Sequence, residues 1–334
     1  MIYIGKTRLQ ELTQTASHKK IIVIGDLMVD EYLWGKVTRI SPEAPVPIIG
    51  IDSEQIRFGG AANVAYNLIG LHAHPILMGV VGDDRMGEIF QAMLRENNLP
   101  SDGVIVSPDR PTTVKTRIIG NNQHIARVDK ESTEPISAEM QDILYEKMVD
   151  YIDEVEAVII QDYNKGVIVP NLVERITNLA NRHGKYITVD PKFENFLTFK
   201  EVTLFKPNTK EAEEALAIRI RNDEDFIAAG KCLLKKLECK AVLITRGSRG
   251  MALFQNDGEI TFVDARARKV ADVSGAGDTV IATFTYALCG GASMKEAVTM
   301  ANYAAGLVCE EVGVVPVELE KLQQAILKDE TISD

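Results

Sequence analysis

Residues 271–281 read ADVSGAGDTVI and hold the side chains with the clearest chemical potential in the chain. Gly275, Ala276 and Gly277 allow the backbone to turn tightly and to approach a ligand without a bulky side chain in the way. The apolar run that follows predicts a helix, and the first N–H groups of a helix form an anion site. Asp278 falls in the first helical turn, where the dipole favours a carboxylate that can accept a hydroxyl proton. An anion site beside a base is what phosphoryl transfer to an alcohol requires.

The same residues also have a structural explanation, in which the glycines form an ordinary loop and Asp278 only caps a helix. Other phosphate-binding loops are disfavoured by their own motifs. The segment contains no GxxxxGK(S/T), which excludes a P-loop here. The first expected strand is followed by IGDLMVD and not by GxGxxG, which disfavours a dinucleotide-binding fold.

A second polar cluster lies at residues 206–214, which read KPNTKEAEE. Asn208 ends a predicted strand and Glu211 follows one helical turn later, so both side chains can face one cleft. Oxygen ligands of this kind suit Mg²⁺, which keeps part of its water shell. The alternative is an ordinary helix start, whose acidic residues are favoured by the helix dipole.

A set of cations lies further towards the N-terminus. The sequence TVKTR places Lys115 and Arg117 at alternate positions of a predicted strand, so both point to one side. Arg127 lies on the next strand of an expected hairpin, and Arg57 is a further cation just before Gly59. Converging cations in an acidic protein indicate a phosphate site, whereas the alternative is a solvated strand face.

These segments belong to a chain of 334 residues with 46% apolar and 25% charged residues, a composition typical of a packed globular protein. Lys and Arg total 37 against 48 Asp and Glu, and the net charge of −11 disfavours nucleic-acid and acidic-membrane partners. The four cysteines form no CxxC pair, so we expect neither a zinc site nor a disulfide framework. The chain has no run of 18 apolar residues and no signal-peptide core, so we expect a cytoplasmic protein without a membrane span.

Short apolar runs alternate with amphipathic stretches, a pattern typical of a parallel sheet covered on both faces. We therefore expect one α/β domain over residues 1–334, built on a doubly wound, mostly parallel sheet with helices on both faces. Predicted strands lie at 20–26, 74–84, 157–163, 186–192, 202–208 and 241–247, and predicted helices at 137–150, 170–183 and 222–237. Segments 31–58 and 103–130 read as strands without a helix, and we expect both to form a small antiparallel β-sheet lid.

Two long signatures resemble those of the ribokinase-like (PfkB) carbohydrate kinase family. DVSGAGDT resembles the family's C-terminal signature, and residues 57–84, RFGGAANVAYNLIGLHAHPILMGVVGDD, resemble its N-terminal one. Further segments, among them TRISPEAPVPI, PTTVKTRIIGNNQHIARVD and DPK, resemble the branch that phosphorylates D-glycero-β-D-manno-heptose 7-phosphate. The resemblance covers residues 20–317 and implies a doubly wound α/β domain with a β-sheet lid.

The resemblance implies an enzyme that uses ATP and Mg²⁺, with a monovalent cation such as K⁺ beside the anion hole in many relatives. Its branch implies transfer to the anomeric 1-hydroxyl of heptose 7-phosphate, giving the 1,7-bisphosphate for ADP-heptose and lipopolysaccharide core synthesis. Since no HxGH-type nucleotidyltransferase segment occurs before Asp334, the sequence resembles the stand-alone kinase. The alternatives are a family kinase for another sugar, sugar phosphate or nucleoside, and a non-catalytic sugar- or nucleotide-binding regulator.

The resemblance also implies a role for each candidate residue. Asp278 is the general base, and Gly275, Ala276 and Gly277 form the hole for the transferred phosphoryl group. The residues implied for ATP and Mg²⁺ are Lys206, Asn208, Glu211 (on the metal partly through water), Thr245, Gly247 and Asn302, with Asp272 as a ligand of the monovalent cation. Those implied for the sugar phosphate are Asp30, Gly59, Gly60, Asn63, Lys115, Arg117 and Arg127.

Lids of this family present strand edges that pair in dimers, so the resemblance implies a homodimer formed through the lid. Trp34, in the first lid segment, is the candidate for packing across the partner's lid. An unpaired apolar strand edge is an aggregation hazard, which gives a physical reason for such pairing.

Overall fold

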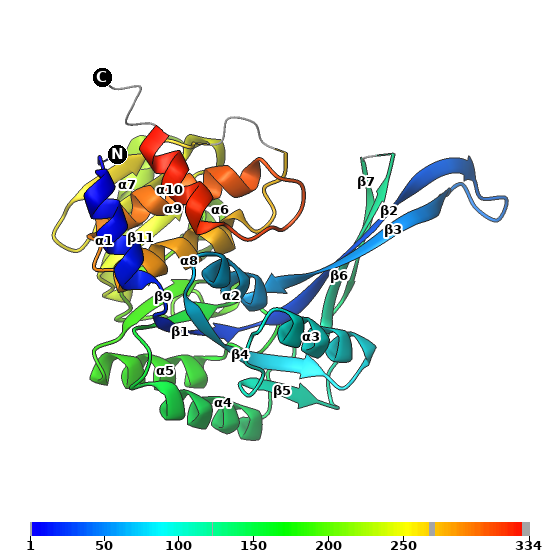
Figure 1. Ribbon diagram of the computed structural model, residues 1–334, viewed down its shortest axis with the longest axis horizontal. Coiled ribbons are helices and arrows are strands. Elements are labelled where there is room, and N and C mark those ends of the chain that lie inside the picture. The colour runs from blue at the N-terminus through cyan, green and yellow to red at the C-terminus, as the bar shows by residue number, and fades with distance from the viewer. Residues whose placement is uncertain (1, 122, 267–270, 329–334) are drawn as a thin grey trace.

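The computed structural model describes residues 2–121, 123–266 and 271–328 (Figure 1). These residues form a nine-stranded sheet that is parallel from β11 to β5 and antiparallel only at the edge made by β12 and β13. In sheet order the strands are β13 (Ile260–Val263), β12 (Met251–Gln255), β11 (Ala241–Thr245), β10 (Leu204–Phe205), β9 (Tyr186–Asp190), β8 (Ala157–Gln161), β1 (Lys20–Gly25), β4 (His74–Gly82) and β5 (Val104–Ser107). The predicted doubly wound, mostly parallel sheet is confirmed.

Strand β1 shows why helices cover both faces of this sheet. Ile21 and Val23 point into one apolar cluster, whereas Ile22 and Ile24 point into another, because successive side chains of a strand alternate between faces. Figure 1 shows α4 and α5 on one side of the sheet and α2 and α8 on the other. The first cluster is built with α1 (Lys6–Ala16), α2 (Ala61–Gly70), α3 (Arg85–Glu96), α8 (Ala276–Cys289), α9 (Met294–Cys309) and α10 (Leu319–Lys328), and the second with α4 (Ala138–Tyr151), α5 (Pro170–Arg182), α6 (Thr209–Leu216) and α7 (Asp223–Leu237).

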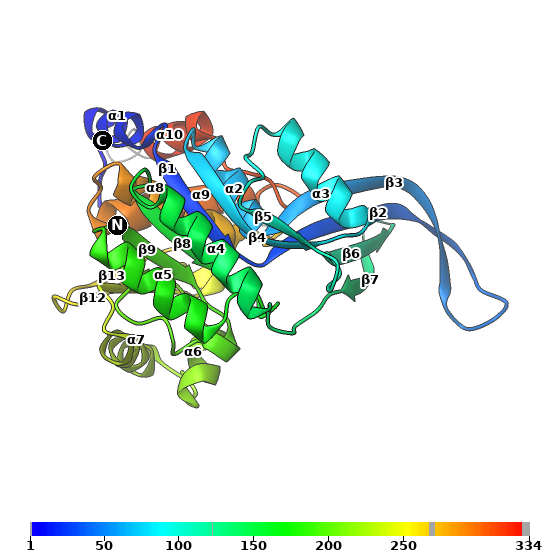
Figure 2. The ribbon, with the colours of Figure 1, turned by 90° about the horizontal axis from the view of Figure 1, so that it is seen from below.

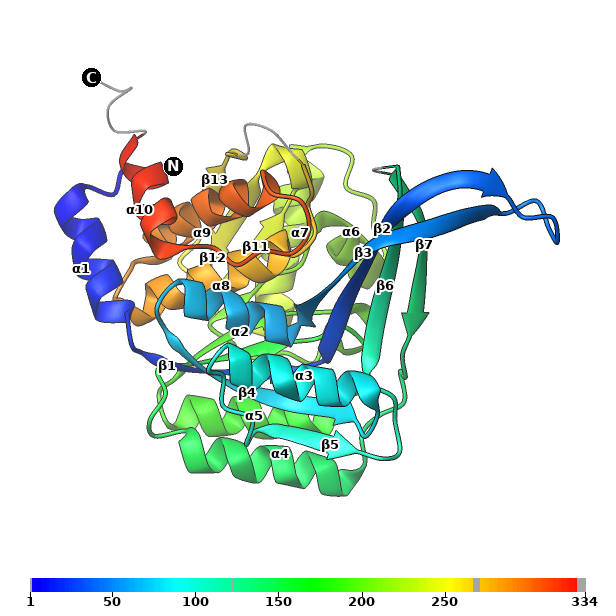
Figure 3. The same ribbon diagram turned by 45° about the vertical axis from the view of Figure 1, so that its right-hand side comes forward.

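A second sheet of four strands, which we call the lid, projects from this body (Figures 2 and 3). Its order is β3–β2–β6–β7, with β2 and β6 parallel and the other two pairs antiparallel. Its strands are β2 (Leu27–Ile40), β3 (Pro47–Gly60), β6 (Thr113–Gly120) and β7 (Gln123–Lys130).

The prediction that all of segment 103–130 belongs to the lid is wrong for its first strand. Strand β5 pairs in parallel with β4 and extends the main sheet, with Val104 opposite Gly79. The apolar run at 104–106 is compatible with either sheet, and only its long-range pairing with β4 decides between them. The lid strands of this segment therefore begin at Thr113.

The main sheet also contains strands that the sequence analysis did not predict. Strands β12 and β13 are the runs MALFQ and ITFV on either side of an Asp257–Gly258 turn, a spacing typical of a hairpin. Strand β10 is shorter than the predicted 202–208, since its continuous pairing covers only Leu204 and Phe205, with a separate bridge at Asn208.

The parallel strands all end at the same edge of the sheet, where open α/β sheets bind their ligands. Only Asp26 separates the end of β1 from the start of β2, so the lid begins at this same edge. The loops after β8, β9, β10 and β11 thus lie along the same edge of the sheet as the base of the lid. No helix in the described ranges is long and apolar enough to cross a membrane.

Candidate active site

The glycine turn predicted at 275–277 forms the start of helix α8. Gly275 is the N-cap with φ of 78°, in the left-handed region, and a Cβ there would lie 2.9 Å from Asn63 Nδ2. Glycine is required here because both the dihedral and the close approach of α2 exclude a side chain. A Cβ on Gly277 would lie 3.4 Å from Lys206 Nζ. The turn that the sequence predicts as an anion site therefore lies next to an ammonium group.

Asp278 lies in the first turn of α8 and is 4% exposed. Its Oδ2 accepts a hydrogen bond from Asn63 Nδ2 at 2.8 Å. Its Oδ1 accepts one from Gln161 Nε2 at 2.9 Å and one from the Tyr163 hydroxyl at 2.8 Å. The three donors are neutral and come from α2, β8 and the loop after β8, so tertiary packing fixes the carboxyl group in one orientation.

The helix dipole favours the Asp278 carboxylate, as the sequence indicates, but it does not decide the direction of the pKa shift. Burial is the largest influence and raises the pKa of this carboxyl to about 6, although hydrogen bonds from Asn63 and Tyr163 lower it. The charge of Asp190 also raises the pKa, and that of Lys206 lowers it. The result is a stronger base than an ordinary aspartate, still mostly ionised at neutral pH.

Lys206 and Asp190 form an ion pair beside this carboxylate. Lys206 Nζ lies 2.9 Å from Asp190 Oδ2, and the two side chains are only 4% and 8% exposed. Gln161 Nε2 donates to the same Asp190 oxygen at 3.2 Å while also donating to Asp278. The ends of β8, β9 and β10 are thus linked to the start of α8 through one polar network.

Asn208 and Glu211 occupy the start of α6 in a capping box. Asn208 Oδ1 accepts from the Glu211 N–H at 2.9 Å, and Glu211 Oε2 accepts from the Asn208 N–H at 2.8 Å. The other Glu211 oxygen pairs with Lys192 Nζ. Asn208 and Glu211 therefore form the helix cap that was the structural alternative, and they are the same two residues predicted for Mg²⁺. Lys192, from the DPK segment, adds a cation to this group.

The other residues implied for ATP lie around the end of β11. Thr245 forms a bridge with Asn208, and Gly247 adopts a φ of 58° with open space around its Cβ position. Asn302 is buried, with only 2% of its surface exposed, and is not a solvated residue of its helix. Its Nδ2 donates to the Asp264 carbonyl at 2.8 Å and so connects α9 to the loop after β13.

Asp272, the candidate cation ligand, already accepts two backbone hydrogen bonds. They come from Ser274 at 2.9 Å and from Gly313 at 3.1 Å. Partial burial raises its pKa, but hydrogen bonds from Ser274 and Gly313 outweigh burial and leave the pKa below its ordinary value. The carboxylate is ionised and joins the loop before α8 to the loop after α9.

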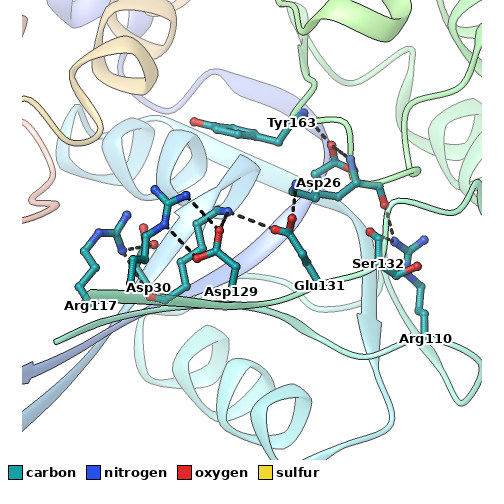
Figure 4. Close-up of polar contacts among 11 residues, drawn as sticks. Asp26, Asp30, Arg110, Arg117, Asp129, Glu131, Ser132 and Tyr163 are labelled. Carbon is teal, nitrogen blue, oxygen red and sulfur yellow. Dashed lines mark hydrogen bonds and ion pairs between the residues drawn. The ribbon is translucent and has the colours of Figure 1, made fainter. Parts of the chain in front are cut away.

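At the base of the lid, Asp30 and Arg117 meet in an ion pair, with Arg117 Nη1 2.5 Å from Asp30 Oδ1 (Figure 4). Burial raises the pKa of Asp30, and the charge of Arg117 opposes this shift. A Cβ on Gly59 would lie 2.7 Å from Asp30 Oδ2, so the close approach predicted for this glycine is made by a neighbouring side chain. Gly60, with φ of 57°, starts α2 and leads directly to Asn63.

The other lid cations also have carboxylate partners, and the labelled Asp129 and Glu131 point towards them in Figure 4. Lys115 Nζ lies 3.1 Å from Asp129 Oδ2 and 3.2 Å from Glu131 Oε2. Arg127 is 57% exposed and lies 2.9 Å from Asp129 Oδ1. Lys165, after β8, pairs with Glu131 at 2.8 Å. The predicted convergence of cations therefore exists, but it is largely neutralised within the chain.

Arg57, the further cation of the sequence analysis, binds backbone carbonyl groups of the chain. Its Nη1 donates to the Val314 carbonyl at 2.8 Å and to the Val312 carbonyl at 3.4 Å. A Cβ on Gly313 would come within 2.7 Å of this guanidinium nitrogen. Arg57 thus ties lid strand β3 to the loop after α9.

Comparison with known proteins assigns this arrangement to a family. The pfkB family carbohydrate kinase model matches residues 18–321. The chain belongs to the pfkB family of carbohydrate kinases. Over 304 residues this kinase is 42% identical to the bifunctional protein HldE of Helicobacter pylori strain G27, and over 321 residues it is 38% identical to HldE of Geobacter sulfurreducens. These alignments cover 91% and 94% of the kinase but 65% of each HldE protein, so the chain spans less than two thirds of these relatives.

Solved structures share the fold of this carbohydrate kinase. Phosphofructokinase-2 from Escherichia coli, in complex with potassium, superposes with a TM-score of 0.77 at 17% identity, covering 93% of the kinase and 99% of that chain. Arabidopsis thaliana ribokinase, complexed with ribose and ATP, superposes with a TM-score of 0.74 at 20% identity, covering 92% and 99%. The protein is therefore an enzyme that transfers a phosphoryl group to a sugar hydroxyl.

Several residues of this kinase's candidate site were missed by the sequence analysis. Gln161, Tyr163, Asp190 and Lys192 all follow or end buried strands at the ligand-binding edge of the sheet. Their position at the ends of predicted strands could have identified them, because polar residues there face the ligand in open α/β sheets. Asp129 gave no such signal, since charged residues on an exposed hairpin are common.

Proposed function

We propose that this carbohydrate kinase transfers the γ-phosphoryl group of ATP to the anomeric 1-hydroxyl of D-glycero-β-D-manno-heptose 7-phosphate, giving the 1,7-bisphosphate. The observation that carries the proposal is the buried Asp278 carboxylate beside the glycine turn, with Asp30 and the lid cations across the same strand edge. Asn63, four residues after Gly59, connects the two parts by its hydrogen bond to Asp278.

In the proposed step, Asp278 accepts the proton of the acceptor hydroxyl while that oxygen forms a bond to the γ-phosphorus. The bond between the γ-phosphorus and the β,γ-bridging oxygen breaks, and ADP leaves. The N–H groups of the turn at 275–277, with Lys206, stabilise the charge on the transferred group. No covalent enzyme intermediate is required, so positioning and water exclusion supply the rate.

The residues at the start of α6 fit a Mg²⁺ ion bound mainly through phosphate oxygens and water. Glu211 uses one lone pair of each oxygen within the chain, which leaves it able to accept from metal-bound water. Within the described ranges, no three His, Cys, Asp or Glu side chains cluster as a metal site. A bound ion would neutralise phosphate charge, and Glu211, with Asn208, would orient its hydration shell. Asp272 has the same spare capacity for a monovalent cation.

The finer choice of acceptor depends on the lid. Lys115, Arg117 and Arg127 supply three positive charges for a distal phosphate, which supports a sugar phosphate. Asp129 and Glu131 already neutralise part of that charge, which favours a second candidate, an acceptor sugar without a phosphate. The two candidates differ in whether substrate phosphate displaces these carboxylates from Lys115 and Arg127.

The test is incubation with ATP and a panel that includes heptose 7-phosphate, free heptose, fructose 6-phosphate, ribose and a nucleoside. We expect ADP release with heptose 7-phosphate and a product heavier by one phosphoryl group, bearing both phosphates. Efficient turnover of an unphosphorylated sugar, with none of heptose 7-phosphate, would support the second candidate. ADP release with no member of the panel would contradict both.

A further inference from the structure

We propose that Tyr163 is a positioning residue that, together with Gln161, fixes one oxygen of Asp278 so that the other oxygen faces the acceptor hydroxyl. The inference rests on the proposed role of Asp278 as the base. Tyr163 has no role in the phosphoryl-transfer step as described above, and positioning Asp278 would be its function.

The hydrogen bonds of Asp278 divide unequally between its two oxygens. Oδ1 accepts from both Gln161 and Tyr163, whereas Oδ2 accepts only from Asn63. A carboxylate offers about four acceptor sites, two on each oxygen. Both sites on Oδ1 are therefore filled, and the remaining site is on Oδ2, where an incoming hydroxyl would bind.

Of the two donors to Oδ1, Gln161 also binds a second carboxylate, that of Asp190. Gln161 is the last residue of the interior strand β8 and is 0% exposed. Its Nε2 donates to both Asp278 and Asp190. The Tyr163 hydroxyl donates its single proton to Asp278 at 2.8 Å and also contacts the Gln161 side chain. The tyrosine is consequently the donor whose removal changes the base without dismantling the network of Asp190 and Lys206.

The backbone of Tyr163 is fixed by a buried carboxylate at the end of β1. Asp26, 1% exposed, accepts from the Tyr163 N–H at 2.7 Å and from the Lys165 N–H at 3.1 Å with one oxygen, and from the Val167 N–H at 3.1 Å with the other. Figure 4 shows Asp26 beside the start of this loop, with the Tyr163 ring extending away from it. Lys192 Nζ lies 5.4 Å from the ring centroid, over its face. The position of the Tyr163 ring is therefore fixed by the hydrogen bond of its backbone to Asp26 and by the contact of Lys192 with one face of the ring.

The charged groups facing Asp278 are Asp190, Lys192 and Lys206, from the ends of β9 and β10, while α2 contributes only the neutral Asn63. Burial and neighbouring carboxylates raise the pKa of Tyr163 well above 10, so its hydroxyl remains a donor throughout the working range. A hydrogen-bond donor stabilises the carboxylate anion. Its loss therefore raises the pKa of Asp278, so that the protonated carboxyl group gives up its proton less readily. The Tyr163 hydroxyl thus sets both the orientation and the proton affinity of the base.

The experiment compares Tyr163→Phe with Tyr186→Phe on the intact protein, the second being the same chemical change at the first residue of β9, at the other end of that strand from Asp190. For Tyr163→Phe we expect kcat at pH 7 to fall about tenfold or more, with the sugar KM within about threefold. On the acid side of the pH profile, the fall in kcat/KM (the acidic limb) should move to higher pH by about half to one unit. The loss of activity relative to the wild type should therefore become smaller as pH rises. Tyr186→Phe should leave kcat, KM and the limb unchanged.

Two outcomes would overturn the inference. An unshifted limb with normal kcat would show that the hydroxyl is only structural. A lower sugar KM at unchanged kcat would show that it merely occupies the place of the acceptor. Thermal unfolding checks that the variant is folded, and Gln161→Met, which removes the other donor to Oδ1, must shift the limb in the same direction. If Asp278→Asn retains turnover, the base assignment fails whatever Tyr163 does.

Discussion

The ionisation of Asp278 is subject to two opposing influences. A position in the first turn of a helix favours the carboxylate, whereas burial favours the neutral acid. Burial is the larger influence here and raises the pKa to about 6, although hydrogen bonds from Asn63 and Tyr163 limit the rise. The group is therefore basic enough to take a hydroxyl proton while remaining mostly ionised at neutral pH.

Asp278→Asn tests the base directly, because it keeps the size of the side chain and removes its basicity. We expect kcat to fall by about 10²- to 10⁴-fold, the range typical of general-base catalysis, with the Kd of ATP changed less than about threefold. Steady-state kinetics and calorimetric nucleotide titration measure the two quantities. A variant within tenfold of the wild-type kcat would reject the assignment.

The raised pKa of Asp278 also predicts how the wild-type rate depends on pH. Since only the carboxylate can accept a proton, activity is present above its pKa and is lost as pH falls through about 6. At pH 5, kcat/KM should be about tenfold below its plateau, since one pH unit below the pKa leaves about a tenth of the base ionised. A profile measured from pH 5 to 9 that stays flat down to pH 5 would contradict this prediction.

At the scale of elements, the start of α8 depends on a glycine that two elements constrain at once. Gly275 needs a positive φ, and α2 leaves no space for its Cβ because Asn63 Nδ2 would lie 2.9 Å away. The same turn is the proposed phosphate site and the anchor of Asp278. Local strain and catalytic geometry are therefore coupled at this position.

Gly275→Ala should both destabilise the fold and impair catalysis, whereas Gly291→Ala should only destabilise it. Gly291 also has a positive φ, of 83°, but nothing lies within 4 Å of its Cβ position. We expect each variant to lose about 1–2 kcal/mol of unfolding free energy from backbone strain, with a further loss in Gly275→Ala from the contact with Asn63. Denaturant unfolding and kcat measure both effects. Equal losses of kcat in the two variants would mean that the contact with α2 has no bearing on catalysis.

The lid is the element that should distinguish one acceptor from another. Lys115 lies on β6 between Asp129 and Glu131, where it can be shared with a substrate phosphate. Lys115→Met should raise the KM for heptose 7-phosphate at least tenfold and leave the KM for ATP unchanged. Arg175→Met, a remote surface cation paired with Asp142, is the control. An equal effect on both substrates would place Lys115 outside the sugar-phosphate site.

At the scale of the whole molecule, the lid leaves a broad exposed surface. Every residue of β7 is exposed, and Val128 on it is 55% exposed. An open strand with apolar side chains invites pairing, and a second copy of the lid would supply a matching strand. We therefore propose a homodimer formed through the lid, as the resemblance implies. Trp34 lies in β2, where its ring stacks on Tyr32 at 6.5 Å between centroids.

Val128→Asp tests this assembly, because a charge on the exposed lid strand disfavours pairing between copies. We expect light scattering to give a dimer for the wild type and a monomer for the variant at micromolar concentration. Val149→Asp places the same charge on α4, at a residue that is 45% exposed, and should leave the dimer intact. A wild type that is monomeric would contradict the proposal.

The amino-acid sequence by itself determined the doubly wound sheet and the glycine turn before α8. Both follow from local information: continuous apolar runs separated by amphipathic helices, and glycines followed at once by a helical run. The resemblance carried by the two signatures extended this to a family, which the comparisons confirm.

Only the tertiary structure decided which sheet β5 joins, which donors bind Asp278 and how far the lid cations are neutralised. Each depends on contacts between segments distant in the chain, such as Tyr163 with Asp278 or Lys165 with Glu131. The pKa of Asp278 is the clearest case, since its helix position is local but its burial is not. Desolvation arises from packing of the whole fold, and no local pattern records it.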